Sequence, residues 1–387
     1  MTEDRRHLAL CVFNLSGQGG EPRRMTTLAN AFAARGHKVD LVAVRSHGPP
    51  RHELSDSVRV VALNPWWTHL PLVRTGRWAL ATIPALANYL RRERPAVLLS
   101  STHLVNIAAP WARSLARVPT RLVLRIITQL SLPTLNVRAR FRLWQARLFY
   151  ALADAIITNS NGLADDVARV AGVPRESITT IYDPVLTPEV QDKIGAALDH
   201  PWFTPGSPPV LLAVSRFTLQ KDLPTLFEAL ARVRSVRPAR LIVLGDGKER
   251  AKLERLAWEL GVAADICLPG FVANPFPYMA RASVFVLSSA WEGLPGVLIE
   301  AMACGCPVVS TDCPSGPAEI LDRGAYGKLV PVGDEAALAE AILATLEAPA
   351  DRNRLRARAA LFSEDDKIDQ YLQVLQEAVS SSGRHHG

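Results

Sequence analysis

Short apolar runs and stretches of helical periodicity alternate in the first half of the chain. An apolar run at 8–15 leads into the glycine loop SGQGG at 16–20. The next segment, 23–36, has apolar positions every three or four residues, and a second apolar run follows at 38–44. These patterns predict strand, helix and strand. That order forms a βαβ unit, which requires a parallel sheet.

Three more apolar runs in this half predict strands at 96–100, 121–127 and 155–160. We therefore expect residues 1–190 to form a doubly wound α/β domain. The segment 191–208 contains several prolines and no strand periodicity, which is typical of an interdomain linker.

A second α/β series follows this linker. Its apolar runs predict strands at 210–215, 240–247, 265–270, 283–289 and 307–311. We assign residues 209–362 to a second doubly wound domain and 363–380 to an amphipathic helix that packs back toward the N-terminal domain. The predicted architecture is two Rossmann-like domains that face a central cleft. Ligands of such sheets bind beyond the carboxyl ends of the strands.

Length and composition agree with two folded domains. The 387 residues exceed the size of one comfortable core, and 48% of them are hydrophobic and 21% charged. No apolar run reaches the roughly 18 residues that a membrane-spanning helix needs, so we expect a cytoplasmic protein. We expect the five cysteines to be reduced thiols, and no histidine or second cysteine pair completes a metal site around CGCPVVSTDC.

Positive charge is concentrated in the first half. Residues 1–185 contain 24 Lys and Arg against 12 Asp and Glu, whereas the rest contains 20 against 25. No acidic residue lies between Glu93 and Asp154, and aromatics occur there in FRLWQARLFY at 141–150 and earlier at Trp66 and Trp67. The arginines of this acid-free segment are at 94, 113, 117, 121, 125, 138, 140, 142 and 147. The pattern favours an anionic membrane at the inner face, although a basic surface that binds nothing remains an alternative.

Two cations occupy one predicted turn of the second domain. Arg216 and Lys221 lie between the strand at 210–215 and a helix that begins near Asp222 to Pro224. A helix N-terminus with two nearby cations suits a diphosphate, while two solvated side chains would give the same sequence. The glycine turns at Gly245 and at Gly19 and Gly20 permit close approach to a phosphate or sugar, or are plain turns.

The stretch WEGLPGVLIEAMACG places two glutamates around a predicted helix start. Pro295 fits the first turn of the helix and Gly305 its C-terminal cap, so Glu292 lies in the preceding loop and Glu300 in the helix. Eight positions span about 12 Å in a continuous helix, too far for a shared proton or metal. The spacing suits two separate parts of one elongated ligand such as a nucleotide sugar.

These motifs closely resemble the family 4 retaining glycosyltransferases, which have the GT-B fold. The resemblance is carried in the second domain by AVSRFTLQKDLPTLFEAL, LGDGKERAKLERLAWELG and WEGLPGVLIEAMACGCPVVSTDCPSGPAEIL, and in the first by GGEPRR, LANAFAARGHKVDLVAV and IITNSNGLADDVARVAGVPRESITTIYDPV. It implies transfer of a sugar from a nucleoside diphosphate, most plausibly UDP linked to a hexose or N-acetylhexosamine. The implied acceptor is lipid-linked or a polysaccharide.

The resemblance also implies roles for single residues. Arg216 and Lys221 would hold the donor diphosphate, Glu300 the ribose, and Glu292 would lie close to the donor sugar. The remaining implied donor contacts are Gly20 on the diphosphate, Phe271 and Val272 around the base, and the backbone at Gly293, Leu294 and Pro295 along the sugar and phosphate. The two cations, Arg216 and Lys221, and the helix N-terminus would stabilise the leaving diphosphate. We therefore expect no metal or other cofactor and no obligatory side-chain base.

The chain departs from the family pattern at three positions. Ile127 and Thr128 stand where many relatives have histidine and asparagine, so an acceptor contact is missing or moved. His103, just after another strand, is the substitute candidate, with a structural histidine as the alternative. Asp183 replaces a usual asparagine. Two other functions stay open: a GT-B sugar-nucleotide epimerase, and a nucleic-acid-binding protein, for which no recognition motif accompanies the basic charge.

Overall fold

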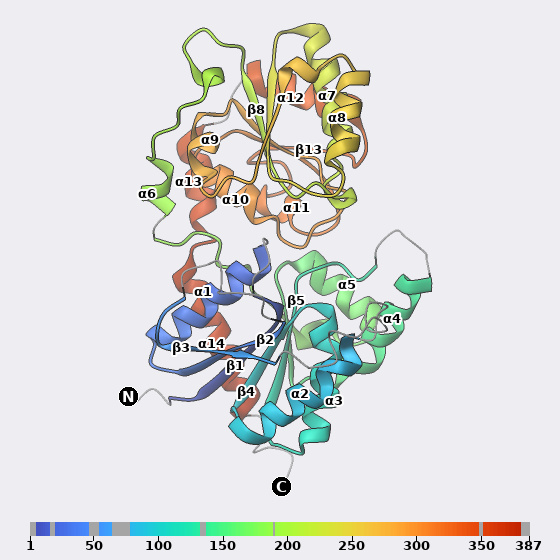
Figure 1. Cartoon of the computed structure of the whole chain (residues 1–387), viewed down its shortest axis with the longest axis vertical. Coiled ribbons are helices and arrows are strands. Elements are labelled where there is room, and N and C mark those ends of the chain that lie inside the picture. Colours follow the sequence, from blue (N-terminus) through green and yellow to red (C-terminus); the bar gives the residue numbers. More distant parts are fainter. Residues whose placement is uncertain are drawn as a thin grey trace. The chain divides into compact units, whose positions relative to one another are not determined.

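The computed structural model describes seven stretches of the chain, which leave out both termini and six internal segments. They are residues 5–15, 20–45, 54–63, 78–131, 137–188, 190–347 and 351–380. The chain divides into two compact units (Figure 1). Unit 1 comprises Met1–Pro184 with Asp365–Gly387, and unit 2 comprises Val185–Glu364. The structure thus divides the chain six residues before the predicted domain end at 190.

Unit 1 contains a parallel sheet in the order β3-β2-β1-β4-β5-β6-β7. Its strands are β1 His7–Asn14, β2 Lys38–Arg45, β3 Val58–Ala62, β4 Val97–Ser101, β5 Arg121–Ile126, β6 Ala155–Thr158 and β7 Ile178–Thr180. Its helices are α1 Gly20–Ala34, α2 Trp78–Glu93, α3 His103–Ala116, α4 Val137–Phe149, α5 Asn161–Ala171 and α14 Glu364–Ser380. The strands point the same way, so all their carboxyl ends lie along one edge of the sheet.

Helices cover both faces of this sheet (Figure 1). On one face α1 and α14 pack together, through residues such as Phe32 and Tyr371, against the buried side chains of β1 and β2. On the other face α2, α3 and α5 cover β4 and β5. Helix α14 therefore completes the core of unit 1, and an ion pair between Arg35 and Asp369 joins α1 to α14.

Unit 2 contains a second parallel sheet, in the order β10-β9-β8-β11-β12-β13. Its strands are β8 Val210–Val214, β9 Arg240–Leu244, β10 Ile266–Gly270, β11 Val284–Leu287, β12 Val308–Thr311 and β13 Lys328–Val330. Its helices are α6 Val190–Ile194, α7 Leu223–Val236, α8 Arg250–Glu259, α9 Phe276–Arg281, α10 Gly296–Ala303, α11 Pro317–Ile320, α12 Glu335–Glu347 and α13 Arg352–Ala360. The segment expected as a linker holds the short helix α6, which packs on α9.

Each sheet has the strand order of a Rossmann-like fold, with the chain reversing direction across the sheet between β1 and β4 and between β8 and β11. The strands predicted from apolar runs are present in both units. Three strands were not predicted: β3, β7 and β13, all at sheet edges. Among the described residues, no helix is both long and apolar enough to cross a bilayer. The five cysteines are free, as expected.

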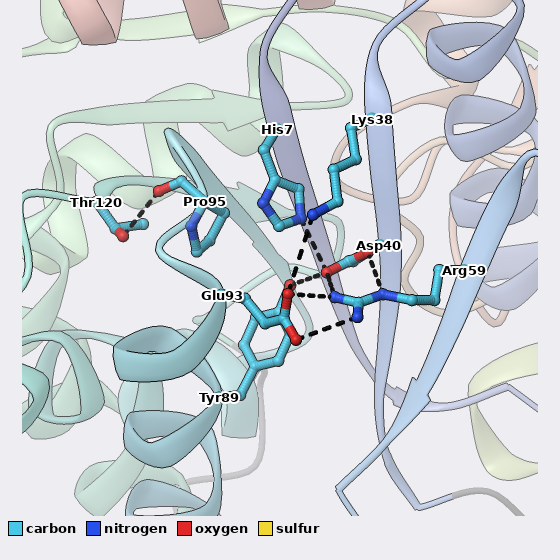
Figure 2. Close-up of polar contacts among 8 residues, drawn as sticks. All are labelled: His7, Lys38, Asp40, Arg59, Tyr89, Glu93, Pro95 and Thr120. Atoms are coloured by element: carbon cyan, nitrogen blue, oxygen red, sulfur yellow. Dashed lines mark hydrogen bonds and ion pairs between the residues drawn. The ribbon is translucent and has the colours of Figure 1, made fainter.

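A polar network lies at the amino edge of the unit 1 sheet (Figure 2). Buried Asp40 accepts hydrogen bonds from Arg59 Nη2 at 2.6 Å and from Tyr89 Oη at 2.6 Å, and His7 Nε2 lies 2.9 Å away. Burial opposes the charged form, but these partners hold the pKa of Asp40 well below its usual range. His7, Asp40 and Glu93 come close enough to ligate a metal. However, the Arg59 guanidinium bridges both carboxylates, and we assign the cluster a structural role.

Candidate active site

The candidate site of unit 2 lies at the topological switch point of its sheet. β8 and β11 are neighbours there, and the helices that follow them, α7 and α10, leave from the same edge. Both loops begin beyond the carboxyl ends of these strands. This is the position where open α/β sheets bind ligands.

The loop between β8 and α7 contains both predicted cations and places Lys221 directly before a helix N-terminus. A 3-10 turn at Leu219–Lys221 is followed by Asp222, whose φ of 43° is left-handed and which caps α7. Pro224 occupies the first turn of α7, as expected from the sequence. The Arg216 side chain is exposed and forms no hydrogen bond or ion pair within the described residues.

The loop between β11 and α10 places Glu292 against Lys221. Lys221 Nζ lies 2.5 Å from Glu292 Oε1, and the two side chains are 13% and 8% exposed. The hydroxyl of Ser289 donates to the same carboxylate oxygen at 2.7 Å. Two residues that are 71 positions apart in the sequence thus form one nearly buried ion pair.

Further hydrogen bonds connect the same two loops. The Ser288 hydroxyl donates to the backbone carbonyl of Lys221 at 2.8 Å, and Gln220 Nε2 donates to the carbonyl of Trp291 at 2.9 Å. The Ala290 N–H donates to the carbonyl of Gln220 at 2.9 Å. These contacts fix the backbone around Lys221 to the end of β11, so the ammonium group has a defined position.

Helix α10 begins where the sequence predicted, within one residue. Glu300 lies in this helix and is only 4% exposed, as its apolar neighbours suggested. Gly293, Leu294 and Pro295 are buried, and the N–H groups of the first two donate to no acceptor within the described part of the chain. A Cβ added at Gly316 would lie 2.4 Å from the Gly293 carbonyl oxygen, so the loop before α11 packs directly on this segment.

The glycine turn after β9 packs against the loop that contains Arg216. Gly245 has a φ of 135°, and a Cβ built there would lie 1.9 Å from the carbonyl oxygen of Ser215. Its N–H donates to the carbonyl of Gly270 at 2.8 Å, which connects this turn to the end of β10. Phe271 follows with 62% of its surface exposed, and Val272 is partly buried. An exposed aromatic ring at this edge is available for stacking on a base.

In unit 1 two predicted residues lie at the carboxyl edge of the sheet. Gly20 is the first residue of α1, and a Cβ there would meet no atom within 4 Å. His103 is the first residue of α3, with Nδ1 3.0 Å from the Tyr150 hydroxyl. The preceding Thr102 has a φ of 76°, a strained value for a β-branched residue. Gly19 lies outside the described residues.

Comparison with protein families decides the identity of both units. The model described as glycosyl transferases group 1 matches residues 198–362, and the model described as glycosyl transferase 4-like domain matches residues 19–184. The lipopolysaccharide core biosynthesis glycosyltransferase LpsE of Rhizobium meliloti is 30% identical over 94% of this chain and 97% of its own. The chain belongs to the group 1 glycosyltransferases.

Another relative agrees with this assignment, and solved structures show the fold. A Campylobacter jejuni N-acetylgalactosaminyltransferase that acts on a diphospho-undecaprenol substrate is 30% identical over 57% of this chain and 59% of its own. Sucrose-phosphate synthase from Thermosynechococcus elongatus superposes with a TM-score of 0.81 over 97% of this chain and 100% of its own, at 22% identity. Anabaena HepE in complex with UDP and glucose superposes with a TM-score of 0.74 over 96% of this chain and 100% of its own, at 20% identity. The glycosyltransferase therefore has the GT-B fold.

A buried arginine explains one departure from the family pattern. Arg125, at the carboxyl end of β5, is 1% exposed and forms an ion pair with Asp183. Its Nε donates to the Tyr371 hydroxyl of α14 at 2.9 Å, and Asn159 Nδ2 donates to Asp183 at 3.1 Å. Asp183 thus supplies the negative charge that this buried guanidinium requires. The sequence had placed Arg125 among the arginines of a basic surface, and the structure corrects that assignment.

Glu21 is a polar residue at the carboxyl edge of unit 1 that the sequence reasoning passed over. It lies in the first turn of α1, where burial raises the pKa of its carboxyl and the charge of Arg125 opposes this rise. The Ser101 hydroxyl, at the end of β4, also opposes this rise in the pKa. Its position directly after the glycine loop, at the start of a helix, is the feature of the sequence that could have indicated Glu21 as a site residue.

Proposed function

We propose that this glycosyltransferase moves a sugar from a nucleoside-diphosphate sugar to a lipid-linked or polysaccharide acceptor in cell-surface glycan assembly. The observation that carries the proposal is the ion pair between Lys221 and Glu292, which joins the loop before α7 to the loop before α10 at the switch point of unit 2. Relatives named for lipopolysaccharide core biosynthesis support the glycan class. HepE, whose structures contain UDP or UDP-glucose, supports a UDP-linked hexose, and the relative named as an N-acetylgalactosaminyltransferase supports an N-acetylhexosamine.

The proposed chemistry follows from the charges of the site. Breaking the bond between the anomeric carbon and the phosphate oxygen leaves negative charge on the nucleoside diphosphate. Lys221, Arg216 and the free N–H groups at the start of α10 can stabilise that charge in a partly dehydrated site. We propose that the acceptor oxygen attacks the face that the phosphate leaves and that the departing phosphate takes the acceptor proton. This route retains the anomeric configuration and uses no side-chain base.

Glu300 provides a test of the proposed nucleotide position. Its buried carboxylate is assigned to the ribose hydroxyls, which donate hydrogen bonds well to a charged acceptor. We expect Glu300→Ala to weaken UDP binding about 10-fold or more, because a charge-assisted hydrogen bond typically contributes this much to the affinity. Titration calorimetry of the wild type and the variant measures this directly. Unchanged affinity would remove Glu300 from the ribose.

The lipid-linked acceptor makes a membrane-facing surface part of this proposal. Six large apolar side chains on α3, α4 and the turn after α4 are between 46% and 54% exposed: Trp111, Leu115, Phe141, Trp144, Leu148 and Leu152. The rings of Phe141 and Trp144 stack with centroids 5.6 Å apart. Exposed Arg117 follows α3 directly, exposed Arg140 and Arg147 lie in α4, and neither helix contains an acidic residue. We propose that this surface, here called the α3–α4 surface, contacts anionic lipid headgroups.

The structure reduces the number of arginines available to this surface. Arg113 and Arg121 form ion pairs with Asp154, and Arg125 is buried against Asp183. Trp66 and Trp67, which the sequence suggested as interfacial aromatics, lie outside the described residues. The proposed membrane contact therefore depends on the exposed aromatics of α3 and α4 as much as on charge.

Sedimentation with liposomes tests the α3–α4 surface. We expect the wild type to bind vesicles that contain phosphatidylglycerol and to lose most of this binding in high salt. The double variant Phe141→Ser/Trp144→Ser should reduce the bound fraction at least about 10-fold, because two aromatic anchors are lost. Trp258→Ser is the matched control, since Trp258 is 79% exposed but lies on α8 of unit 2. Binding that ignores both lipid charge and the double substitution would contradict the proposal.

A further inference from the structure

The site of unit 2 contains an anion next to its largely buried cation. Lys221 Nζ contacts Glu292 Oε1 at 2.5 Å, and both side chains have little contact with solvent. An ammonium group buried without a partner would carry a large desolvation cost, which this carboxylate offsets. A diphosphate that binds Lys221 therefore competes with Glu292 for the same charge.

Ser289 determines where that carboxylate lies. Its hydroxyl donates to Glu292 Oε1 at 2.7 Å, and Ser289 itself is fully buried. Its backbone carbonyl accepts a hydrogen bond from the Thr311 hydroxyl at 2.6 Å, and Thr311 is the last residue of β12. One oxygen of Glu292 thus has two donors, whereas Oε2 accepts no hydrogen bond within the described residues. The carboxylate is held by one oxygen and keeps the other for a ligand hydroxyl.

We propose that Glu292, positioned by Ser289, is the resident counter-ion of Lys221, and that the donor diphosphate takes over the lysine when it binds. This inference rests on the proposed function, because it requires a diphosphate donor at Lys221. Before the donor arrives, the carboxylate neutralises the buried lysine. Once phosphate oxygens bind the ammonium group, Ser289 still holds the carboxylate, which then accepts a hydrogen bond from a hydroxyl of the donor sugar. The exchange couples recognition of the diphosphate to recognition of the sugar.

The decisive experiment compares ligand binding with turnover in Glu292→Gln. The amide keeps the shape of the side chain and still accepts the Ser289 hydrogen bond, but it no longer competes with phosphate for Lys221. We expect this variant to bind UDP and inorganic pyrophosphate about fivefold more tightly or better, because Lys221 no longer has to give up a charged partner when phosphate binds. The rate of sugar transfer should fall at least about 10-fold, because a charged partner of the sugar hydroxyl is lost. A merely structural defect would weaken ligand binding and lower the rate of sugar transfer together.

Two further variants identify the residues responsible. In a Lys221→Met background, Glu292→Gln should no longer tighten UDP binding, because there is no lysine to release. Ser289→Ala should lower kcat several-fold while UDP binds at least as tightly as to the wild type, and Ser289→Thr, which keeps the hydroxyl, should restore most of kcat. Ser310→Ala is the matched control, because Ser310 of β12 is equally buried and its hydroxyl donates to a backbone carbonyl and not to the carboxylate. It should change kcat by less than Ser289→Ala does.

The outcomes separate this inference from the proposed function. If the wild type binds neither UDP nor pyrophosphate, the diphosphate donor and the counter-ion role are both wrong. If the wild type binds UDP but folded Glu292→Gln binds it equally or more weakly, the counter-ion role is overturned and the donor class stands. Should Glu292→Gln fail to fold, Ser289→Ala decides, because unchanged kcat or weakened UDP binding in that variant would overturn the positioning role.

Discussion

Lys221→Ala is expected to lower kcat/KM for sugar transfer by on the order of 10² to 10³, the usual loss when one preorganised charge-stabilising group is removed. The ammonium group is held by Glu292 and by the hydrogen bonds that connect the loops after β8 and β11. It therefore needs no rearrangement of its backbone to meet the charge that develops on the leaving diphosphate. Initial-rate kinetics with a transferable nucleotide sugar measure the loss.

Lys248→Ala is the matched control for this prediction. Lys248 is an exposed lysine in the loop after β9 of the same unit, and we expect its removal to change kcat/KM less than twofold. Because Lys221→Ala also leaves Glu292 buried without its partner, the variant should be checked for folding by circular dichroism. A folded Lys221→Ala protein with kcat/KM within about threefold of the wild type would contradict the assignment.

Arg125→Met is expected to reduce the free energy of unfolding by about 3 to 5 kcal/mol, because it leaves Asp183 as a buried charge without its partner. The substitution also removes the hydrogen bond to Tyr371, which connects β5 to α14. The loss should appear as a lower midpoint of urea unfolding. Arg140→Met, at an exposed position of α4, should change stability by no more than about 0.5 kcal/mol.

A compensating substitution tests the physical reason for this loss. In Arg125→Met/Asp183→Asn the unpaired charge is gone, and asparagine is the residue usual in the family pattern at this position. We expect the double variant to recover at least half of the lost stability, since breaking a buried pair costs more than replacing it. Equal stability of the single and double variants would show that Asp183 is not the origin of the effect.

The central strands of both sheets could be predicted from sequence because their side chains are buried on both faces and form continuous apolar runs. The edge strands could not. β13 has only three residues, of which Val330 alone is buried, and β3 buries only Val58. Short, half-exposed strands leave no run long enough to distinguish from a loop. Their pairing depends on neighbours that a local pattern does not contain.

The candidate site was partly predictable for a related reason. Strand ends and helix starts are local features, so the sequence placed Lys221 and Glu292 in loops at the same edge of one sheet. Their direct contact depends on β8 and β11 being neighbours, which joins loops 71 residues apart. Arg125 shows the reverse case. Its charge suggested a surface position, yet it follows three apolar residues in β5 and is buried in the core.

The most direct test of the account is to incubate the protein with a panel of nucleotide sugars and to measure release of the free nucleoside diphosphate, with Lys221→Ala in parallel. The account predicts that one donor, a UDP-sugar, stabilises the protein against heat and is slowly cleaved to UDP, and that Lys221→Ala loses this cleavage. Absence of UDP release from every donor, or isomerisation of the sugar nucleotide without free UDP, would contradict it.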